Sequence, residues 1–528
     1  MRVAARFRPG AEGDSHIFSP YFERLFGIDL RSLAVFRLAL GVLLLADLYI
    51  RVQDLSAHYT DWGVLPRDIL IPHLSDPLPF SVHLVSGSSF GQAVIFLIAG
   101  VFALALLVGF RTPMVTVASW LLLLSVQARN PRLLHDSDVL LRMLLFWGMF
   151  VPLGARYSLD SLTRRSGADG AQLPTSVCSV GTAALMLQVC LVYWCTAAFK
   201  SWDAWWHEAS AVYYALHIDQ IVTPFGLWLL GFPDLLALLS RATIALEFFG
   251  PCLVFVPFCT PWLRMCMVGA FFCFHIGLAL CMSIGLFPYV SMVSWLVFVP
   301  SLVWERGRFV AGPSASRSPS LPQAPNGSAQ TIHSLRASRL AQALAAFFLV
   351  YIVLWNLRGL EATSSYVRQI FPPQANLVGY LLRLDQRWDM FSPSPLQADG
   401  WFVMPGTLLD GSRVELWTGK RMVSWEKPLN VSDQYPNDRW WKFMENLYPM
   451  EWGRAAALDA YAGYVCRDWN ARHGGRQQLD TFQVVYMQET TLPDYQDIQP
   501  EKKLLGEYAC GEYSGDAARE MPALQDER

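Results

Sequence analysis

Long apolar runs fill the first 357 residues and constrain the fold more than any other feature. Of the 528 residues, 53% are hydrophobic and 16% are charged, whereas soluble domains carry about 25% charged residues. An apolar helix of about 20 residues crosses the hydrocarbon core of a bilayer. The sequence predicts a mainly α-helical, polytopic membrane bundle of about nine spans: 33–50, 92–109, 112–128, 139–154, 181–199, 235–258, 262–282, 286–304 and 340–357.

The distribution of Arg and Lys between the loops predicts the orientation of this bundle. Arg and Lys concentrate in the cytoplasmic loops of membrane proteins. With nine spans, most loop arginines fall on one side, and Arg129, Arg132 and Lys200 fall on the other. We therefore expect a multi-pass protein of the bacterial inner membrane, with its N-terminus in the cytoplasm and its C-terminus outside.

The same pattern divides the chain into five parts. We expect a cytoplasmic N-terminal segment (1–30), a transmembrane domain (31–305), a disordered Ser/Pro-rich cytoplasmic linker (306–336) and a last transmembrane helix (337–358). Residues 359–528 are expected to form an amphipathic segment and a small outward-facing α+β domain, with a hairpin turn at Asp410-Gly411. The cysteines of this domain, Cys466 and Cys510, either pair as a disulfide on the oxidising side or stay free.

Several ionisable side chains lie within or beside the predicted spans. An ionisable group inside a membrane faces a partner or a wet cavity. Either these residues stabilise the bundle through separate interhelical hydrogen bonds, or they share one cavity that opens outward. Their number favours the shared cavity, and we expect it to include Arg37, Asp47, Asp138, Arg142, Glu247 and His275.

A patch of charge and tryptophan follows the fifth span. Lys200, Asp203, Trp205, Trp206 and His207 fall within eight residues. A lysine with tryptophans at a membrane boundary commonly anchors a helix end. The acid and base that follow Lys200 suggest instead a reaction site at the membrane surface, in which Asp203 tunes Lys200 and His207 adds a polar group to the cavity.

Several classes of function are excluded by what the sequence lacks. The net charge is −2, and there is no basic run, so we expect no nucleic-acid partner. There is no HExxH, CxxC or Gly-rich phosphate loop, so we expect no metal cofactor and no ATP-driven chemistry.

Six short stretches follow one another through the predicted transmembrane domain: Ser32-Leu-Ala-Val-Phe-Arg37, Leu107-Val-Gly-Phe-Arg111, Tyr157-Ser-Leu-Asp160, Phe199-Lys-Ser-Trp-Asp-Ala-Trp-Trp206, Phe274-His275 and Ser283-Ile-Gly-Leu-Phe-Pro-Tyr289. In order and spacing, they resemble the HTTM superfamily and the vitamin K-dependent γ-carboxylase within it. The resemblance covers about residues 30–305.

The resemblance implies a chemistry. In that family a lysine deprotonates reduced vitamin K, oxygen converts the quinol into a strong base, and the base removes a glutamyl γ-proton before carbon dioxide adds. It implies a reduced quinone as cofactor, a peptide or protein substrate on the outward side, and catalytic roles for Lys200 and His275. His135 lies near the family's functional histidine, although its spacing to Ser158-Leu-Asp160 differs by about two residues.

One departure leaves two functions open. The family has Lys-Lys with the second lysine as base, whereas this chain has Lys200-Ser201. Either Lys200 takes over in a quinol-linked, carboxylase-like enzyme, or the chain is a non-catalytic assembly factor or scaffold that binds a partner through its C-terminal domain. A transporter is a weaker third interpretation, because no inverted repeat is visible.

Overall fold

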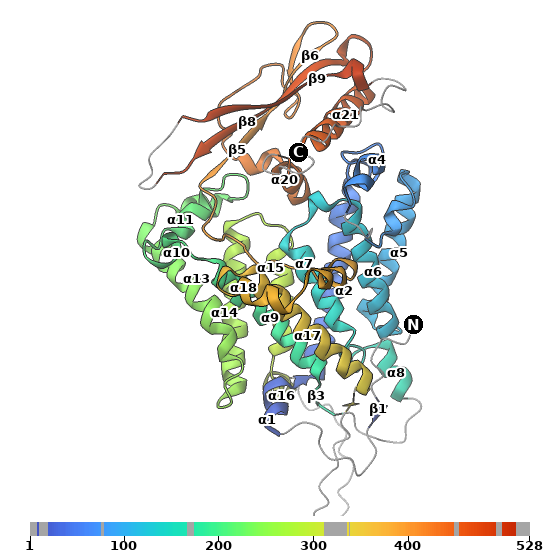
Figure 1. Ribbon diagram of the computed structural model, residues 1–528, viewed down its shortest axis with the longest axis vertical. Helices are drawn as coiled ribbons and strands as arrows, with labels where there is room; N and C mark the ends of the chain where they lie inside the picture. Colours follow the sequence, from blue (N-terminus) through green and yellow to red (C-terminus); the bar gives the residue numbers. More distant parts are fainter. Residues whose placement is uncertain are drawn as a thin grey trace, which may run out of the picture.

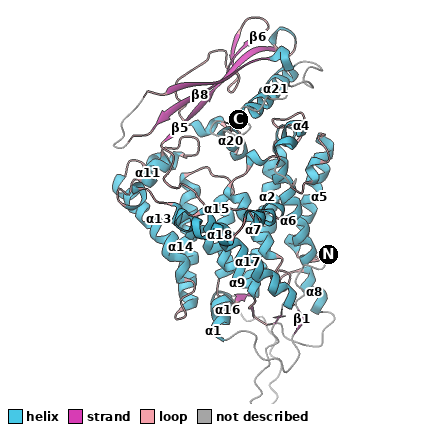
Figure 2. Ribbon diagram, viewed as in Figure 1, coloured by secondary structure: helices cyan, strands magenta, loops and turns pink. Residues whose placement is uncertain are grey.

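The fold places an antiparallel sheet on one end of a helical bundle (Figure 1). It is a computed structural model that describes residues 8–9, 20–74, 79–165, 174–310, 335–336, 338–447, 454–492 and 499–513. Figure 2 shows that the long strands gather at the end away from α1 (Pro20–Phe26) and α16 (Ser301–Val310). The expected N-terminal segment (1–30) and linker (306–336) lie largely outside the described residues.

In the part of the chain that the structure describes, six helices are long and apolar enough to cross a membrane, so this is a multi-pass membrane protein. Each has 20 to 24 residues. They are α2 (Leu30–Gln53), α5 (Ser89–Val108), α9 (Val180–Phe199), α13 (Pro233–Leu253), α14 (Thr260–Cys281) and α17 (Arg339–Gly359).

The expectation of nine spans is not confirmed. The other three apolar runs form α6 (Thr112–Arg129), α7 (Asp136–Gly148) and α15 (Phe287–Trp295). All but two of the 13 residues of α7 are buried, so its apolar run packs against protein. Hydropathy responds to apolar content and does not distinguish a core helix from a membrane span.

Local sequence signals set the ends of the helices that carry the site. Asp29 caps α2 by accepting a hydrogen bond from the Arg31 N–H, and Ser179 caps α9 by accepting one from the Thr182 N–H. The helix α5 ends at Gly109, whose φ of 71° suits glycine. A side chain at Gly109 would also collide with Ser158 and with the Arg37 guanidinium.

The C-terminal domain is a five-stranded antiparallel sheet with two helices. The 12-residue β8 (Leu479–Thr490) pairs along one edge with β5 and β6 and along the other with β9. The expected Asp410-Gly411 turn joins β6 to β7. The remaining elements are β5 (Ala398–Val403), β6 (Pro405–Leu408), β7 (Arg413–Glu415), β9 (Glu501–Ala509), α20 (Asp438–Glu445) and α21 (Arg454–Arg472).

Two further contacts complete this domain. Cys466 of α21 and Cys510 form a disulfide with Cα atoms 5.4 Å apart. Along the chain, α18 (Glu361–Ile370) and α19 (Asn376–Leu381) follow α17. Figure 1 shows α18 beside the bundle and α20 at the junction of sheet and bundle.

Candidate functional site

A cavity of about 650 Å³ lies where the helical bundle meets the C-terminal domain. Its walls come from α7, α9, α13 and α14, from the short helices after α9, from the loop 389–396 and from α20. Its lining is mostly apolar with a few polar groups, as is usual for pockets that hold small molecules.

The central polar feature of this cavity is an ion pair between Lys200 and Glu247. Lys200 directly follows α9, and its Nζ lies 2.5 Å from Oε2 of Glu247 on α13. Both residues are buried, at 3% and 4% exposure. The Lys200 ammonium also lies 4.2 Å from the centre of the Trp205 ring. Burial lowers the pKa of Lys200, and the nearby Glu247 carboxylate opposes that shift.

A second polar group in the cavity is centred on His275 of α14. Its Nε2 lies 2.8 Å from the Tyr193 hydroxyl, which also accepts a 2.9 Å hydrogen bond from the Trp295 indole. Among the described residues, no side chain or backbone group bonds the buried Nδ1 of His275. The side chain therefore has one free ring nitrogen for a ligand.

His135 borders the same cavity from the start of α7. Its ring stacks on Trp441 of α20 with centroids 5.5 Å apart, and its Nε2 lies 3.6 Å from the Asp438 carboxylate. Burial lowers the pKa of His135 well below its usual value, and the Arg439 guanidinium adds to this shift. The ring is therefore neutral at pH 7.

Asp203 and His207 lie elsewhere. Both are exposed on α10 (Asp203–Trp206) and the residue that follows it, and His207 Nδ1 lies 2.8 Å from Asp203 Oδ1. The carboxylate in contact with Lys200 is that of Glu247, whereas Asp203 pairs with His207. The four-residue spacing of Asp203 and His207 places these two residues on one face of a helical turn.

Arg37 is also outside the cavity. It is buried and donates hydrogen bonds to backbone carbonyls that include those of Tyr157 at 2.5 Å and Leu153 at 3.3 Å. Nearby, Asp160 accepts bonds from the backbone of Arg111 and Thr112 at the start of α6. This cluster ties the ends of α2, α5 and α6 together.

Asp47, Asp138 and Arg142 belong to two further buried networks. Asp47 and Asp138 are bridged by Arg51 and by Arg439 of α20, and Arg142 bonds Gln127 and the backbone of Asp385. The expected single hollow thus holds Lys200, Glu247, His275 and His135, whereas Arg37, Asp47, Asp138 and Arg142 have separate protein partners. The sequence alone does not show which residue pairs with each of these buried charged side chains.

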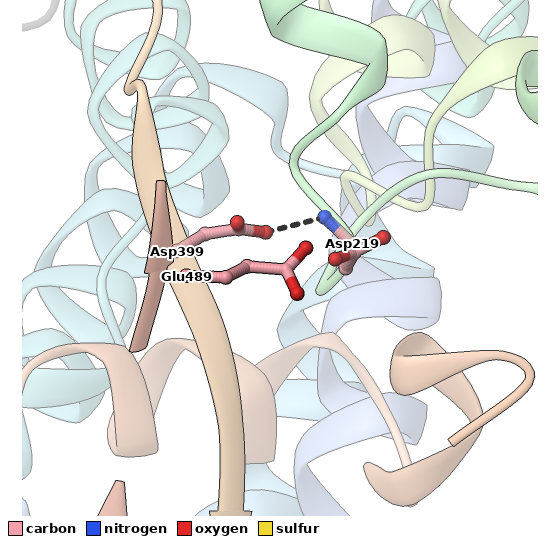
Figure 3. Close-up of side chains that lie close together, drawn as sticks. All are labelled: Asp219, Asp399 and Glu489. Atoms are coloured by element: carbon pink, nitrogen blue, oxygen red, sulfur yellow. Dashed lines mark hydrogen bonds between the residues drawn. The ribbon is translucent and has the colours of Figure 1, made fainter. Parts of the chain in front are cut away.

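An acidic cluster links the C-terminal domain to the segment between α11 (Ala211–Leu216) and α12 (Pro224–Leu229). Figure 3 shows Asp219, Asp399 and Glu489 pointing toward one another, with the Asp219 N–H donating to Asp399 at 2.6 Å. Lys427 bonds Glu489 and lies 2.5 Å from the Asp219 carboxylate. A lysine therefore already supplies positive charge to these three carboxylates, which lie close enough to hold a metal.

Sequence reasoning missed several cavity residues. Tyr193 and Thr196 lie seven and four residues before Lys200, so helical spacing places them on the same face, and this signal was available. Trp441, Lys442 and Glu445 come from α20, more than 130 residues beyond the resembling region, and no motif marks them.

A family model, described as the HTTM domain, matches residues 27–304, which is more than half of the chain. HTTM is the domain of vitamin K-dependent γ-carboxylase. No curated protein and no solved structure matches the chain. The matched region contains the Lys200–Glu247 pair and His275, whereas α20 and the sheet lie outside it.

Proposed function

The chain belongs to the HTTM family, and we propose that it is a membrane-embedded, quinol-linked carboxylase-like enzyme in which Lys200 is the proton acceptor. The observation that carries this proposal is the buried Lys200–Glu247 pair in a large, mostly apolar cavity. A lysine that only anchored a helix end would extend its ammonium into water, whereas this ammonium is enclosed.

The pair suits proton transfer. Removing two charges from water is costly, so a buried ion pair and its neutral form can lie close in free energy. When the Lys200 proton moves to Glu247, the neutral amine can accept a proton from a ligand. Glu247, now a neutral carboxylic acid, holds the first proton, and the Lys200 ammonium formed next balances the charge of the deprotonated ligand within the cavity, where water is largely excluded.

The residues present fit a reduced quinone. Thr243 of α13 and Cys273 and Gly277 of α14 line the cavity, and Cys273 is also exposed on the surface of the bundle. A side chain at Gly277 would meet nothing within 4 Å. We propose that a lipid-soluble ligand enters from the bilayer along this face of α13 and α14, and that the Lys200–Glu247 pair and His275 Nδ1 hold its polar ring.

Bound there, the quinol would supply, with oxygen, the strong base that removes a γ-proton from a glutamyl side chain. Lys200 would take the quinol hydroxyl proton, and Tyr193 would fix the orientation of His275. Ser201, at the position of the family's second lysine, is exposed and offers no base. We propose that Lys200 performs that role, with a peptide or protein substrate approaching from the side of the C-terminal domain.

Measuring incorporation of labelled bicarbonate tests this function. Purified protein in lipid nanodiscs would be given reduced vitamin K, oxygen and a glutamyl peptide. We expect incorporation by the wild type, loss of at least about 100-fold with Lys200→Ala because a general base is removed, and little change with the matched control Ser201→Ala. Equal activity of the wild type and Lys200→Ala would contradict the role of Lys200.

Quinol binding has its own readout in the same samples. A membrane-permeable maleimide should label Cys273, and reduced vitamin K should protect it. Cys259, which directly precedes α14, and Cys266 of α14 are exposed but do not line the cavity, so their labelling should not change. If the wild type shows neither incorporation nor protection, the enzyme proposal is contradicted. That result would favour the scaffold that binds a partner through its C-terminal domain.

A further inference from the structure

The helix α20 forms the roof of the cavity on the side of the C-terminal domain. Trp441, Lys442 and Glu445 of this helix line the cavity, although α20 lies far beyond the matched HTTM region. The helix sits between the bundle and the sheet (Figure 1). The side chains of Lys442 and Glu445 are partly exposed, so this end of the cavity is polar and reaches solvent, whereas the α13–α14 wall is mostly apolar.

Buried charge fixes α20 in this position. Arg439 is 2% exposed, and its guanidinium lies 2.7 Å from Asp47 of α2 and 2.5 Å from Asp138 of α7. Removing one partner of such a buried network leaves an uncompensated buried charge, which is strongly destabilising. The roof is therefore held in place by the bundle itself.

Trp441 joins the two sides of the cavity mouth. Its ring stacks on His135, and its indole N–H donates a 3.1 Å hydrogen bond to Gln220 between α11 and α12. Gln220 in turn donates to the carbonyl of Gly400 in β5 at 2.9 Å. These contacts hold α20 in place, and therefore also fix the backbone position of the next residue, Lys442.

The cavity contains two lysine–glutamate pairs of different character. Lys200 and Glu247 come from different helices and have side-chain exposures of 2% and 6%. Lys442 and Glu445 are three residues apart on α20, 2.6 Å apart, with side-chain exposures of 23% and 25%. A partly exposed pair of this kind contributes little to stability, so another carboxylate can replace Glu445 at little cost.

Among the described residues that line this end of the cavity, Lys442 is the only cation. Asp136 and Asp389 also line it, and Arg387, the partner of Asp389, does not. Among the described cavity residues, the remaining lysine is Lys200, which Glu247 neutralises. An anionic group that approaches from water therefore meets Lys442 as its attractive partner.

We propose that Lys442 is a specificity-determining residue of the cavity, and that a substrate carboxylate docks on its ammonium by displacing Glu445. The proposal rests on the proposed function, because the docked substrate is the one that reaches Lys200. It assigns to the C-terminal domain a direct part in substrate choice, through a residue outside the HTTM domain.

A binding assay on the full-length protein in nanodiscs tests this assignment. The probes are two fluorophore-labelled tripeptides that differ only in a central glutamate or glutamine, with binding read by fluorescence polarisation. The wild type should bind the glutamate peptide about two- to fivefold more tightly than the glutamine peptide, as expected for a partly exposed ion pair.

The variants should change this preference in opposite directions. Lys442→Gln should abolish it, whereas Glu445→Gln should increase it by freeing the ammonium. Lys442→Arg should retain it, as should Lys420→Gln, which makes the same charge change at an exposed site of the same domain. If Lys442→Gln does not fold, Glu445→Gln still tests the proposal, because the preference for the glutamate peptide should increase in this variant.

The assay separates this proposal from the proposed function. It needs neither quinol nor bicarbonate, and Lys200→Ala should keep the glutamate preference while losing turnover. An absent preference in the wild type would overturn the proposal. So would a loss of preference in both Lys442→Gln and Glu445→Gln, because that result would show a purely structural role for the pair.

Discussion

Lys200 and Glu247 neutralise each other across 47 residues of sequence, from two different helices. Among the described residues, each is the only charged partner of the other. Removing one partner of a buried pair leaves a charge without compensation, whereas replacing both by apolar groups of similar size is often neutral for stability. The pair therefore allows its structural role to be separated from a chemical one.

We expect Lys200→Met and Glu247→Met each to lower the free energy of unfolding, on the order of 3–5 kcal/mol. The double substitution should recover most of that loss and remain inactive, because the base is still missing. Unfolding in detergent would measure the stabilities and their coupling. Additive losses in the double variant would show that the two side chains do not interact.

Elements far apart in sequence meet at the acidic cluster. The strand β5 contributes Asp399, β8 contributes Glu489, and the segment between α11 and α12 contributes Asp219. Burial raises the pKa of Asp399 to about 8, and the charges of Asp219 and Glu489 add to this rise, which Lys427 opposes. Burial likewise raises the pKa of Asp219 to about 6.

These shifts predict how pH affects the docking of the sheet on the bundle. In the unfolded chain Asp399 loses its proton near pH 3.9, whereas the folded protein keeps that proton up to about pH 8. The folded state binds more protons between these values, so its stability falls as pH rises. The slope for one such group is at most about 1.4 kcal/mol per pH unit.

Asp399→Asn should therefore flatten the decrease in stability between pH 6 and pH 8. The asparagine oxygen can still accept the Asp219 N–H bond, so the substitution removes charge and keeps shape. Thermal unfolding of wild type and variant at both pH values would measure the difference. If the difference in stability between wild type and variant were the same at pH 6 and pH 8, this interpretation would be contradicted.

In the molecule as a whole, the two ends of the bundle differ. The C-terminal sheet and its Cys466–Cys510 disulfide lie at one end, and α1 and α16 lie at the other (Figure 1). Disulfides persist in oxidising compartments, which agrees with the orientation expected from the arginine distribution. The cavity lies at the end that carries the disulfide.

Reporter fusions in a bacterial host would test this orientation. Alkaline phosphatase folds actively only where disulfides form, so a fusion after residue 528 should be active and a fusion at residue 320 inactive. The Cys466–Cys510 pair should resist thiol labelling without reductant. Activity at residue 320 but not at 528 would reverse the orientation, together with the proposed outward approach of the substrate.

Residues that act through local chemistry could be predicted, and residues that act through long-range contacts could not. The six membrane helices follow from apolar length, and Lys200 stands out because the apolar run stops there. Asp203 and His207 stand out equally in sequence but are exposed. Nothing local distinguishes an exposed charge from an enclosed one.

Sequence determined the helical elements, their caps and the face of α9 that carries Tyr193, Thr196 and Lys200, because hydrogen bonding and periodicity act over a few residues. Tertiary structure decided that Glu247 pairs with Lys200, that Arg37 and Asp47 have partners elsewhere, and that α20 covers the cavity. Neutralisation of a buried charge requires contact in space, and contact depends on how the helices pack.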